Sequence, residues 1–368
     1  MAVPSAVMGS GSSPPHLMGS SNSGMLTLEG NCTPWKVIME RSIAVRSAVM
    51  GSGSFLPPMI IRSKCGTWRL KKKGPPRPFI KKGTVTTCAV SPSGDYIVST
   101  SVTEISSFDG ILTVWDAQQG TERPNLFGHI DRVSGCAVSP DGSWVVSGSG
   151  ETLKVWDAYT GDVRLTLTGH TSVVNGCAVS PDGKWIVSAS YDNTLNIWDA
   201  DTGDILHTLE GHTNWVRGCA VSSSSDFIVS NSDDGTLKVW NARTWTELHT
   251  LTGHIGRVNS CAISPDGKWV VSASDDRTLK KWDAETGAEL RTLNDHIGRV
   301  NSCAISPDGK WIVSASDDET LKVWDAQTGK CLTTLRVDGA LKACAFFSDG
   351  IRLVAGGEGG VYFLKLIQ

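Results

Sequence analysis

The chain has 368 residues, of which 40% are hydrophobic and 19% are charged, and its formal net charge is −3. This composition can form a buried core, and it excludes a disordered, collagen-like or coiled-coil protein. No apolar run approaches the roughly 18 residues of a membrane-spanning helix, and the first residues lack the pattern of a secretion signal, so neither is expected.

The first 60 residues are rich in Gly and Ser and contain fragments that resemble parts of a repeat found later in the chain. For example, AVMGSGS (48–54) is similar to VVSGSGE (145–151). The turn and Trp-Asp sequences of the later repeat are missing here. We therefore predict that residues 1–60 are eroded repeat fragments with loose order.

A basic segment follows, from Arg62 to Lys82, with nine Lys or Arg residues and no acidic residue. The rest of the chain, residues 85–368, is acidic, with 35 Asp or Glu against 22 Lys or Arg. Segment 62–82 could bind nucleic acid or an anionic surface, act as a localisation signal, or present a proline-type ligand. We favour a structural interpretation, in which residues 61–84 form a strand and linker held against the acidic body.

Residues 85–368 consist of repeated units with a period of about 42 residues. One set of Trp residues marks the period: Trp115, Trp156, Trp198, Trp240, Trp282 and Trp324. A set of Cys residues keeps the same phase and adds a seventh unit: Cys88, Cys136, Cys177, Cys219, Cys261, Cys303 and Cys344. Each unit holds four short runs rich in Val, Ile, Trp and Thr, separated by turn sequences such as SPDG and DTGD, which predicts four antiparallel strands.

A single four-stranded unit cannot cover both of its apolar faces, but neighbouring units arranged in a ring can. The GH before the first strand, the SPDG after it and the WD that ends the third strand resemble the signature of the WD-repeat β-propellers. The resemblance covers about 285 residues. It implies an all-β, seven-bladed propeller with four-stranded antiparallel blades.

The resemblance also implies a hydrogen-bonded chain inside each blade, from Trp through a strand Ser and the His of GH to a turn Asp. Four units hold all of these residues, for example His254, Ser272, Asp276 and Trp282. The second unit keeps His129 but has Gly150 where Asp is expected. The first and seventh units depart further, so the weakest blades are expected at the two ends of the repeat array.

The last unit stops after its third strand, so its fourth strand must come from upstream of Val85. The candidate is Thr67–Lys72, because CGTWRL (65–70) is similar to the fourth-strand sequence TGDVRL (160–165). An eighth blade built from the N-terminal fragments is the alternative.

No pattern points to catalysis, a metal or a cofactor. The Ser, His and Asp residues of the repeat resemble a hydrolase triad, but four equivalent copies inside blades favour a structural role. The Cys residues show no paired C-x-x-C spacing, so we expect buried packing rather than metal binding or disulfides, and hence a reducing, cytoplasmic compartment. No phosphate-binding loop of the G-x-x-x-x-G-K type is present.

In WD-repeat propellers that resemble this chain, partners bind on the face formed by the loops between strands four and one and between strands two and three. The corresponding positions here carry Arg, Lys, Asn, Asp and two aromatic residues, and Trp215 with Tyr191 is the expected anchor because aromatic residues and Arg dominate binding hot spots. The predicted partner-binding residues are Arg132, Asn175, Tyr191, Trp215, Arg217, Asp233, Arg257, Asn259, Asp275, Arg299, Asn301, Asp317 and Lys342. In the competing interpretation, Arg257 and Arg299 only pair with Asp275 and Asp317 as exposed salt bridges.

We therefore predict a non-enzymatic scaffold that binds a protein or peptide segment on this loop face. Nucleic-acid binding through residues 62–82 is the alternative, and an enzyme that uses the central channel is the less favoured one.

Overall fold

The computed structural model describes residues 36–38, 60–62, 69–70, 84–102, 110–123, 126, 128–129 and 131–367. All regular elements in these residues are β-strands, and no helix in this part of the chain could cross a membrane. The predictions for residues 1–60 and for the basic segment 62–82 concern residues that for the most part lie outside this description.

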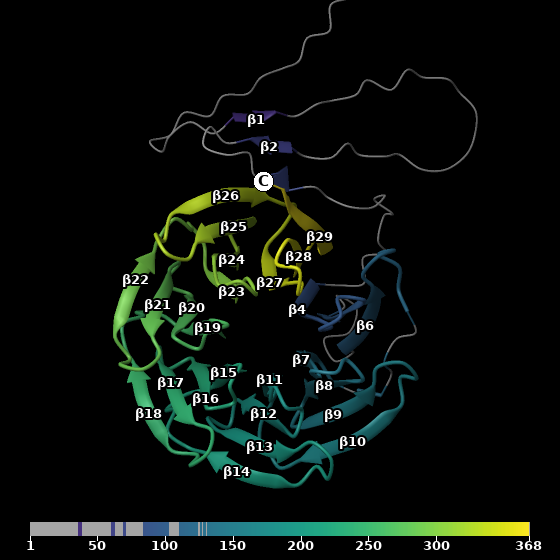
Figure 1. Ribbon diagram of the computed structural model, residues 1–368. Helices are drawn as coiled ribbons and strands as arrows, with labels where there is room; N and C mark the ends of the chain where they lie inside the picture. The colour runs from purple at the N-terminus through teal and green to yellow at the C-terminus, as the bar shows by residue number, and fades with distance from the viewer. Residues whose placement is uncertain are drawn as a thin grey trace, which may run out of the picture.

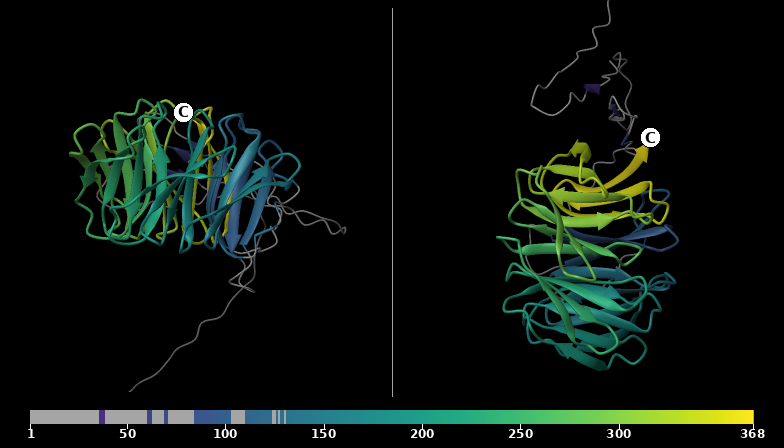
Figure 2. Two further views of the ribbon diagram at one scale, coloured as in Figure 1. Left: turned by 90° about the horizontal axis from the view of Figure 1, so that it is seen from below. Right: turned by 60° about the vertical axis from the view of Figure 1, so that its left-hand side comes forward.

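Seven antiparallel sheets stand around a common centre and form a β-propeller (Figure 1). Blade 1 contains β4–β6, blades 2 to 6 contain β7–β10, β11–β14, β15–β18, β19–β22 and β23–β26, and blade 7 contains β27–β29 with β3. Viewed from the edge, the blades form a flat disc (Figure 2). A separate two-stranded sheet pairs β1 (Lys36–Ile38) with β2 (Ile60–Arg62).

Within blades 1 to 6 the strands run from the centre outward in chain order, and blade 7 follows the same order for β27, β28 and β29 (Figure 1). The first strands are β4 (Thr84–Val90), β7 (Val133–Val138), β11 (Val174–Val179), β15 (Val216–Val221), β19 (Val258–Ile263), β23 (Val300–Ile305) and β27 (Leu341–Phe346). The second strands are β5 (Tyr96–Val102), β8 (Trp144–Ser149), β12 (Trp185–Ser190), β16 (Phe227–Ser232), β20 (Trp269–Ser274), β24 (Trp311–Ser316) and β28 (Arg352–Gly357). The third strands are β6 (Gly110–Asp116), β9 (Thr152–Asp157), β13 (Leu195–Asp199), β17 (Leu237–Asn241), β21 (Leu279–Asp283), β25 (Thr320–Asp325) and β29 (Gly360–Ile367). The outer strands are β10 (Val163–Thr168), β14 (Ile205–Leu209), β18 (Glu247–Leu251), β22 (Glu289–Leu293) and β26 (Cys331–Arg336).

The core is divided into seven clusters, and each fills the space between two neighbouring blades. The cluster between blades 7 and 1 joins Val354 and Phe347 to Ile97 and Trp115, and β27 packs against β4. Because every blade has a partner on both faces, the ring is closed. This arrangement explains why the second strands are buried along their length, as in Trp269–Ser274.

The turn sequences of the repeat fix where strands end. In blade 5, Gly267 adopts a φ of +70°, a left-handed conformation that favours glycine, and its N–H donates to the Ser264 carbonyl at 2.9 Å. The Ser264 hydroxyl donates to Asp266 and accepts the N–H of Trp269, the first residue of β20. The Asp that follows the repeat Trp ends the third strand in the same way, because Asp283 accepts N–H bonds from the turn before β22.

The seventh sheet takes its outermost strand from far upstream, where β3 (Arg69–Leu70) pairs with β29 through Leu366↔Leu70 and Ile367↔Arg69. This pairing involves two residues of the predicted closing segment, Thr67–Lys72. That this segment holds the ring closed stays a prediction. The described part of the chain has seven blades, so the eight-blade alternative is wrong for it.

In the described part of the chain, blade 1 differs from the others, because three strands of its sheet are described there and the isolated bridges Leu112↔Leu126 and Trp115↔Glu122 lie where a fourth strand would lie. The departure of the first unit from the repeat pattern therefore corresponds to an incomplete blade.

Candidate functional site

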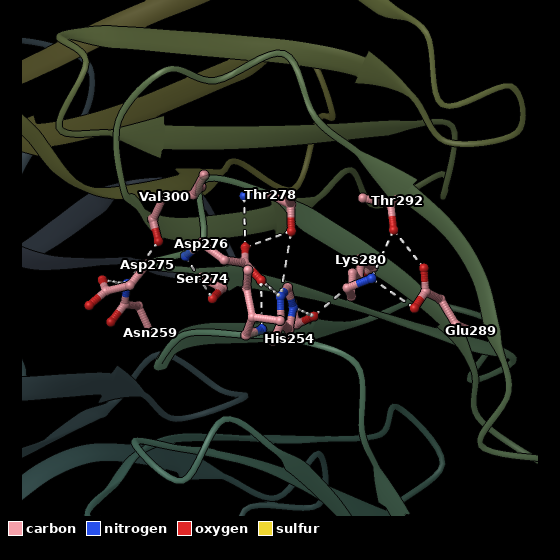
Figure 3. Close-up of polar contacts among 12 residues, drawn as sticks. His254, Asn259, Ser274, Asp275, Asp276, Thr278, Lys280, Glu289, Thr292 and Val300 are labelled. Carbon is pink, nitrogen blue, oxygen red and sulfur yellow. Dashed lines mark hydrogen bonds and ion pairs between the residues drawn. The ribbon is translucent and has the colours of Figure 1, made fainter.

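Inside blades 3 to 6, a hydrogen-bonded chain connects the core to the loop face. In blade 5, the Trp282 indole N–H donates to the Ser272 hydroxyl at 2.8 Å, and His254 Nε2 lies 2.7 Å from the same hydroxyl. His254 Nδ1 lies 2.7 Å from Asp276 Oδ2 (Figure 3). An ionised Asp only accepts, so Nδ1 carries the proton and Ser272 donates to Nε2. The equivalent residues of blades 3, 4 and 6 make the same bonds, so the four complete copies predicted from the sequence are confirmed.

Asp276 also holds its own turn together. Its Oδ1 accepts the N–H and the hydroxyl of Thr278 at 2.9 and 2.7 Å, and its Oδ2 accepts the N–H of Ile255 at 3.2 Å. Burial by itself raises the pKa of Asp276, but the hydrogen bonds from His254 and Thr278 outweigh it and hold the pKa well below its usual range. Both carboxylate oxygens of Asp276 therefore accept hydrogen bonds within the blade, which makes Asp276 a structural residue.

A lysine forms a second polar cluster on the outer side of the His in blade 5. Lys280 Nζ donates to Glu289 Oε2 at 2.8 Å and to the Thr292 hydroxyl at 2.9 Å (Figure 3). In blade 4, Lys238 makes the same pair of contacts, with Glu247 and Thr250. These clusters recur at TLK sequences of the repeat, and the sequence analysis did not identify them.

Blade 2 has the chain only in part. Trp156 donates to Ser147 at 2.7 Å, and His129 Nε2 lies 2.6 Å from the same hydroxyl, but the turn has no Asp to accept from His129 Nδ1. Burial and, as a smaller contribution, the nearby positive charge of Lys154 together lower the pKa of His129 to about 4.

We expect the His129 imidazole to stay neutral in the folded protein down to about pH 4, whereas an unfolded His takes up a proton near pH 6.5. Because the pKa is lower in the folded state, this residue's contribution to stability is complete above about pH 6.5 and decreases as the pH falls towards 4. NMR titration of the imidazole resonances measures the folded pKa. The variant Lys154→Gln removes the repelling charge and should raise it, and an unperturbed pKa for His129 would contradict this assignment.

Six of the predicted partner-binding residues meet at one mouth of the central channel. A cavity of about 420 Å³ opens there, lined by Arg132, Ser134, Asn175, Arg217, Asn259, Asn301 and Lys342, together with Thr84, Thr86 and Val102 of blade 1. Ser134 is not in the predicted set, nor are the three residues of blade 1, which departs from the repeat pattern that identified the others. The mouth is polar and carries three cationic side chains.

Tyr191 and Trp215 form an aromatic corner on the loop face. The rings of Tyr191 and Trp215 stack with their centroids 4.3 Å apart and an interplanar angle of 11°. Trp215 is nevertheless 43% exposed. The Tyr191 hydroxyl donates to the side-chain oxygen of Asn175 at 3.1 Å. Tyr191 thus fixes the orientation of a large exposed aromatic surface.

Most Asn and Asp residues of the predicted set are engaged in the ring itself. Asn259 Nδ2 donates to Asp275 and to the Val300 carbonyl of the next blade, at 2.8 and 3.0 Å (Figure 3). In the same manner, Asn301 donates to the Leu341 carbonyl of blade 7, and Asn175 donates to the Arg217 carbonyl of blade 4. These side chains connect blades, which leaves them fewer donors for a partner.

The ion pairs at the mouth are different from those of the competing interpretation. Arg257 faces Asp233, at 3.6 Å, and not Asp275. Asp317 accepts from Lys342 at 2.5 Å and from Asn301 at 2.6 Å, and not from Arg299. The predicted pairs are wrong because Asn259 and Asn301 already occupy those carboxylates.

Asp233 is a buried rim carboxylate, with 3% of its side chain exposed. The Arg217 guanidinium donates to both of its oxygens, through Nε and, at 2.9 Å, through the other nitrogen. Burial by itself lowers the pKa of Arg217, but the hydrogen bonds to Asp233 and the surrounding negative charges raise it overall. The exposed side chains Arg132 and Arg299 have no hydrogen-bond or ion-pair partner among the described residues.

The in-phase Cys side chains lie between the blades, as expected from their inner-strand positions. Burial raises the pKa of Cys136 to about 12, and the Cys177 thiol donates to the Val146 carbonyl of the preceding blade at 3.7 Å. Among the described residues, no three His, Cys, Asp or Glu side chains are placed to hold a metal ion.

The model of the family "WD domain, G-beta repeat" matches six segments of the chain, at residues 78–116, 120–157, 161–199, 203–241, 245–283 and 287–325. Together these segments make up more than half of the chain, and most of them end at the Asp that follows the repeat Trp. The seventh blade, in which Leu364 takes the place of that Trp, is not matched. A search of curated proteins gave no match. The repeat matches and the seven-bladed ring together show that this chain belongs to the WD40 repeat family of β-propellers.

Proposed function

We propose that this protein is a non-enzymatic scaffold that binds a peptide or protein segment at the mouth of its central channel. WD40 propellers generally act as protein-interaction scaffolds and are typically not enzymes. The observation that carries the proposal is the exposed Trp215 ring, stacked on Tyr191 beside a polar cavity. We further propose a cytoplasmic location, because the free Cys residues fit a reducing compartment.

Trp215 meets the physical requirements for a binding anchor. Its stacking on Tyr191 fixes the ring before a partner arrives, so little side-chain entropy is lost on binding. The exposed cations Arg257 and Arg299 stand at the equivalent position of the next two blades, and Arg and Trp are the residues most enriched in hot spots. A partner that covers Trp215 and reaches these cations would also cover the cavity.

We expect Trp215→Ala to weaken binding of a partner purified with the wild-type protein by about 2 kcal/mol, a typical hot-spot effect. Isothermal titration calorimetry measures this change. Tyr159→Ala is the matched control, because Tyr159 is also an exposed aromatic residue, 71% accessible, but lies in a loop between third and fourth strands, on the opposite face of the disc. Equal affinities of the wild type and of Trp215→Ala would show that partners bind elsewhere.

Binding of nucleic acid through residues 62–82 is the second candidate, because this segment holds nine cationic residues and no acid. Its affinity should fall steeply with salt. Gel-shift experiments at two salt concentrations distinguish it, since binding at the aromatic corner does not require release of phosphate counterions.

A further inference from the structure

Blade 2 lacks a carboxylate that the complete blades provide. In blade 5 the turn between the second and third strands contains Asp276, which accepts from His254 Nδ1. In blade 2 the hairpin is tighter, because Ser149 pairs directly with Thr152 and only two residues stand between them. As a result, no carboxylate of the described part of the chain accepts from His129 Nδ1.

The same blade lacks a second carboxylate at its lysine. Lys154 occupies the position of Lys280 in the repeat, and its Nζ donates to the Thr166 hydroxyl at 3.4 Å, as Lys280 does to Thr292. The position of Glu289, however, is occupied by Val163, which is 42% exposed. Within the described residues, the Lys154 ammonium therefore has no ion-pair partner, although its counterparts in blades 4, 5 and 6 each have one.

Both donor groups open into one cavity. A space of about 850 Å³ on the loop face is lined by His129, Lys154, Arg132 and Tyr191, among others. Its volume is in the range of small-ligand and peptide side-chain pockets. Tyr191 forms part of the wall and stacks on Trp215, so the cavity adjoins the proposed partner site.

Two acidic residues also border this cavity, but neither replaces the missing carboxylates. The Asp131 carboxylate lies next to Gly150, 2.8 Å from where a Cβ would stand, and makes no hydrogen bond to His129 or Lys154. Glu151 is exposed at the tip of the turn. The donors on His129 and Lys154 thus stay available to an acceptor from outside.

We propose that this cavity in blade 2 receives an acidic side chain, Asp or Glu, of the partner segment, whose carboxylate accepts from His129 Nδ1 and Lys154 Nζ. The inference rests on the proposed function, because it assigns a chemistry to the segment bound at the loop face. The partner supplies a carboxylate to a blade that lacks both of the carboxylates found in blade 5, Asp276 and Glu289, and hydrogen bonds between charged groups are the stronger ones.

The test uses phage-displayed random 12-residue peptides, selected on the full-length wild-type protein. We expect the enriched peptides to share an Asp or Glu. Replacing that residue with Gln or Asn in a synthetic peptide should weaken binding at least tenfold, measured by fluorescence polarisation. Two protein variants should have the same effect: Lys154→Gln, which removes the ammonium, and Val163→Glu, which gives Lys154 an internal partner like Glu289 of blade 5.

The matched control is Lys280→Gln, which changes the equivalent lysine of blade 5, whose ammonium already has Glu289 and Thr292. It should bind the peptides as the wild type does. Thermal denaturation of each variant shows that the fold is retained, and His129 is left unchanged because it supports Ser147 and Trp156.

The outcomes separate this inference from the proposed function. Peptides that require Trp215 but lose less than tenfold in affinity with Lys154→Gln would overturn the acidic site and leave the scaffold function standing. Peptides that require Lys154 and not Trp215 would support the acidic site and contradict the anchor. Absence of any peptide enriched on the wild type would overturn both.

Discussion

Replacing Asp276 with alanine is expected to lower the free energy of unfolding by about 3 kcal/mol. The substitution removes the close acceptor of the His254 Nδ1–H in a fully buried side chain and leaves only the Thr278 hydroxyl, at 3.5 Å, and it also removes the acceptor of the Thr278 N–H in the turn. A buried donor without a partner costs more than the hydrogen bond itself contributes, because the group has already lost its hydration. The effect should reach Trp282 through His254 and Ser272.

Urea denaturation of Asp276→Ala and of the wild type measures this loss. Glu285→Ala is the control in the same blade, because Glu285 is exposed, and its effect should stay within about 0.5 kcal/mol. Asp276→Asn should lie between the two, since the amide oxygen still accepts from His254. Similar midpoints for Asp276→Ala and Glu285→Ala would contradict the role assigned to the buried carboxylate.

Lowering the pH should remove the stabilisation that the Asp276 carboxylate provides in the wild type. The pKa of Asp276 is lower in the folded state than the value of about 3.9 for an unfolded Asp. Its contribution is therefore complete above the unfolded pKa and is lost as the pH falls through the folded pKa. The difference in stability between the wild type and Asp276→Ala should accordingly shrink below about pH 4.

Deletion of residues 1–72 is expected to destabilise the propeller by about 3 kcal/mol and to make it self-associate. The deletion removes β3 and leaves the backbone of β29 unpaired along its outer edge, next to the buried Leu364 and Leu366. An exposed strand edge with apolar neighbours is a template for pairing with another chain. Thermal denaturation and analytical ultracentrifugation measure the two effects.

A shorter deletion, of residues 1–59, retains β3 and provides the control. It should melt close to the full-length protein and remain of the same size in solution. If both deletions behave alike, the β3 pairing does not hold the ring closed, and the prediction that Thr67–Lys72 is the closing segment is wrong.

The sequence was informative about the fold because the repeat imposes the same local chemistry several times. A Trp, a strand Ser, a His and a turn Asp at fixed spacing can satisfy one another in one geometry only, so four complete copies predicted the blade interior as the structure has it. Units that lose these residues could be identified as irregular. Their shapes could not be predicted, since a three-stranded blade 1 depends on what packs beside β6.

The partner face was predicted less completely, because it depends on distances between blades. The spacing placed Arg257 near an acidic residue, but it was the positions of neighbouring blades that brought Asp233 within 3.6 Å. Asn259 could be recognised as a loop-face residue, whereas its bond to Val300 crosses to another blade. The role of Lys154 could not be predicted from the sequence, because its missing ion pair becomes evident only when blade 2 is compared with blades whose lysine has one.

The sequence by itself determined the all-β repeat, the hydrogen-bonded chain of each complete blade and the set of residues expected on the loop face. These features arise from hydrogen bonds and turns within one unit, whose residues are close in the chain. Only the tertiary structure decided between the predicted seven blades and the eight-blade alternative, and it alone showed the partners of the rim charges and the carboxylates missing from blade 2, because contacts between units depend on how the ring closes.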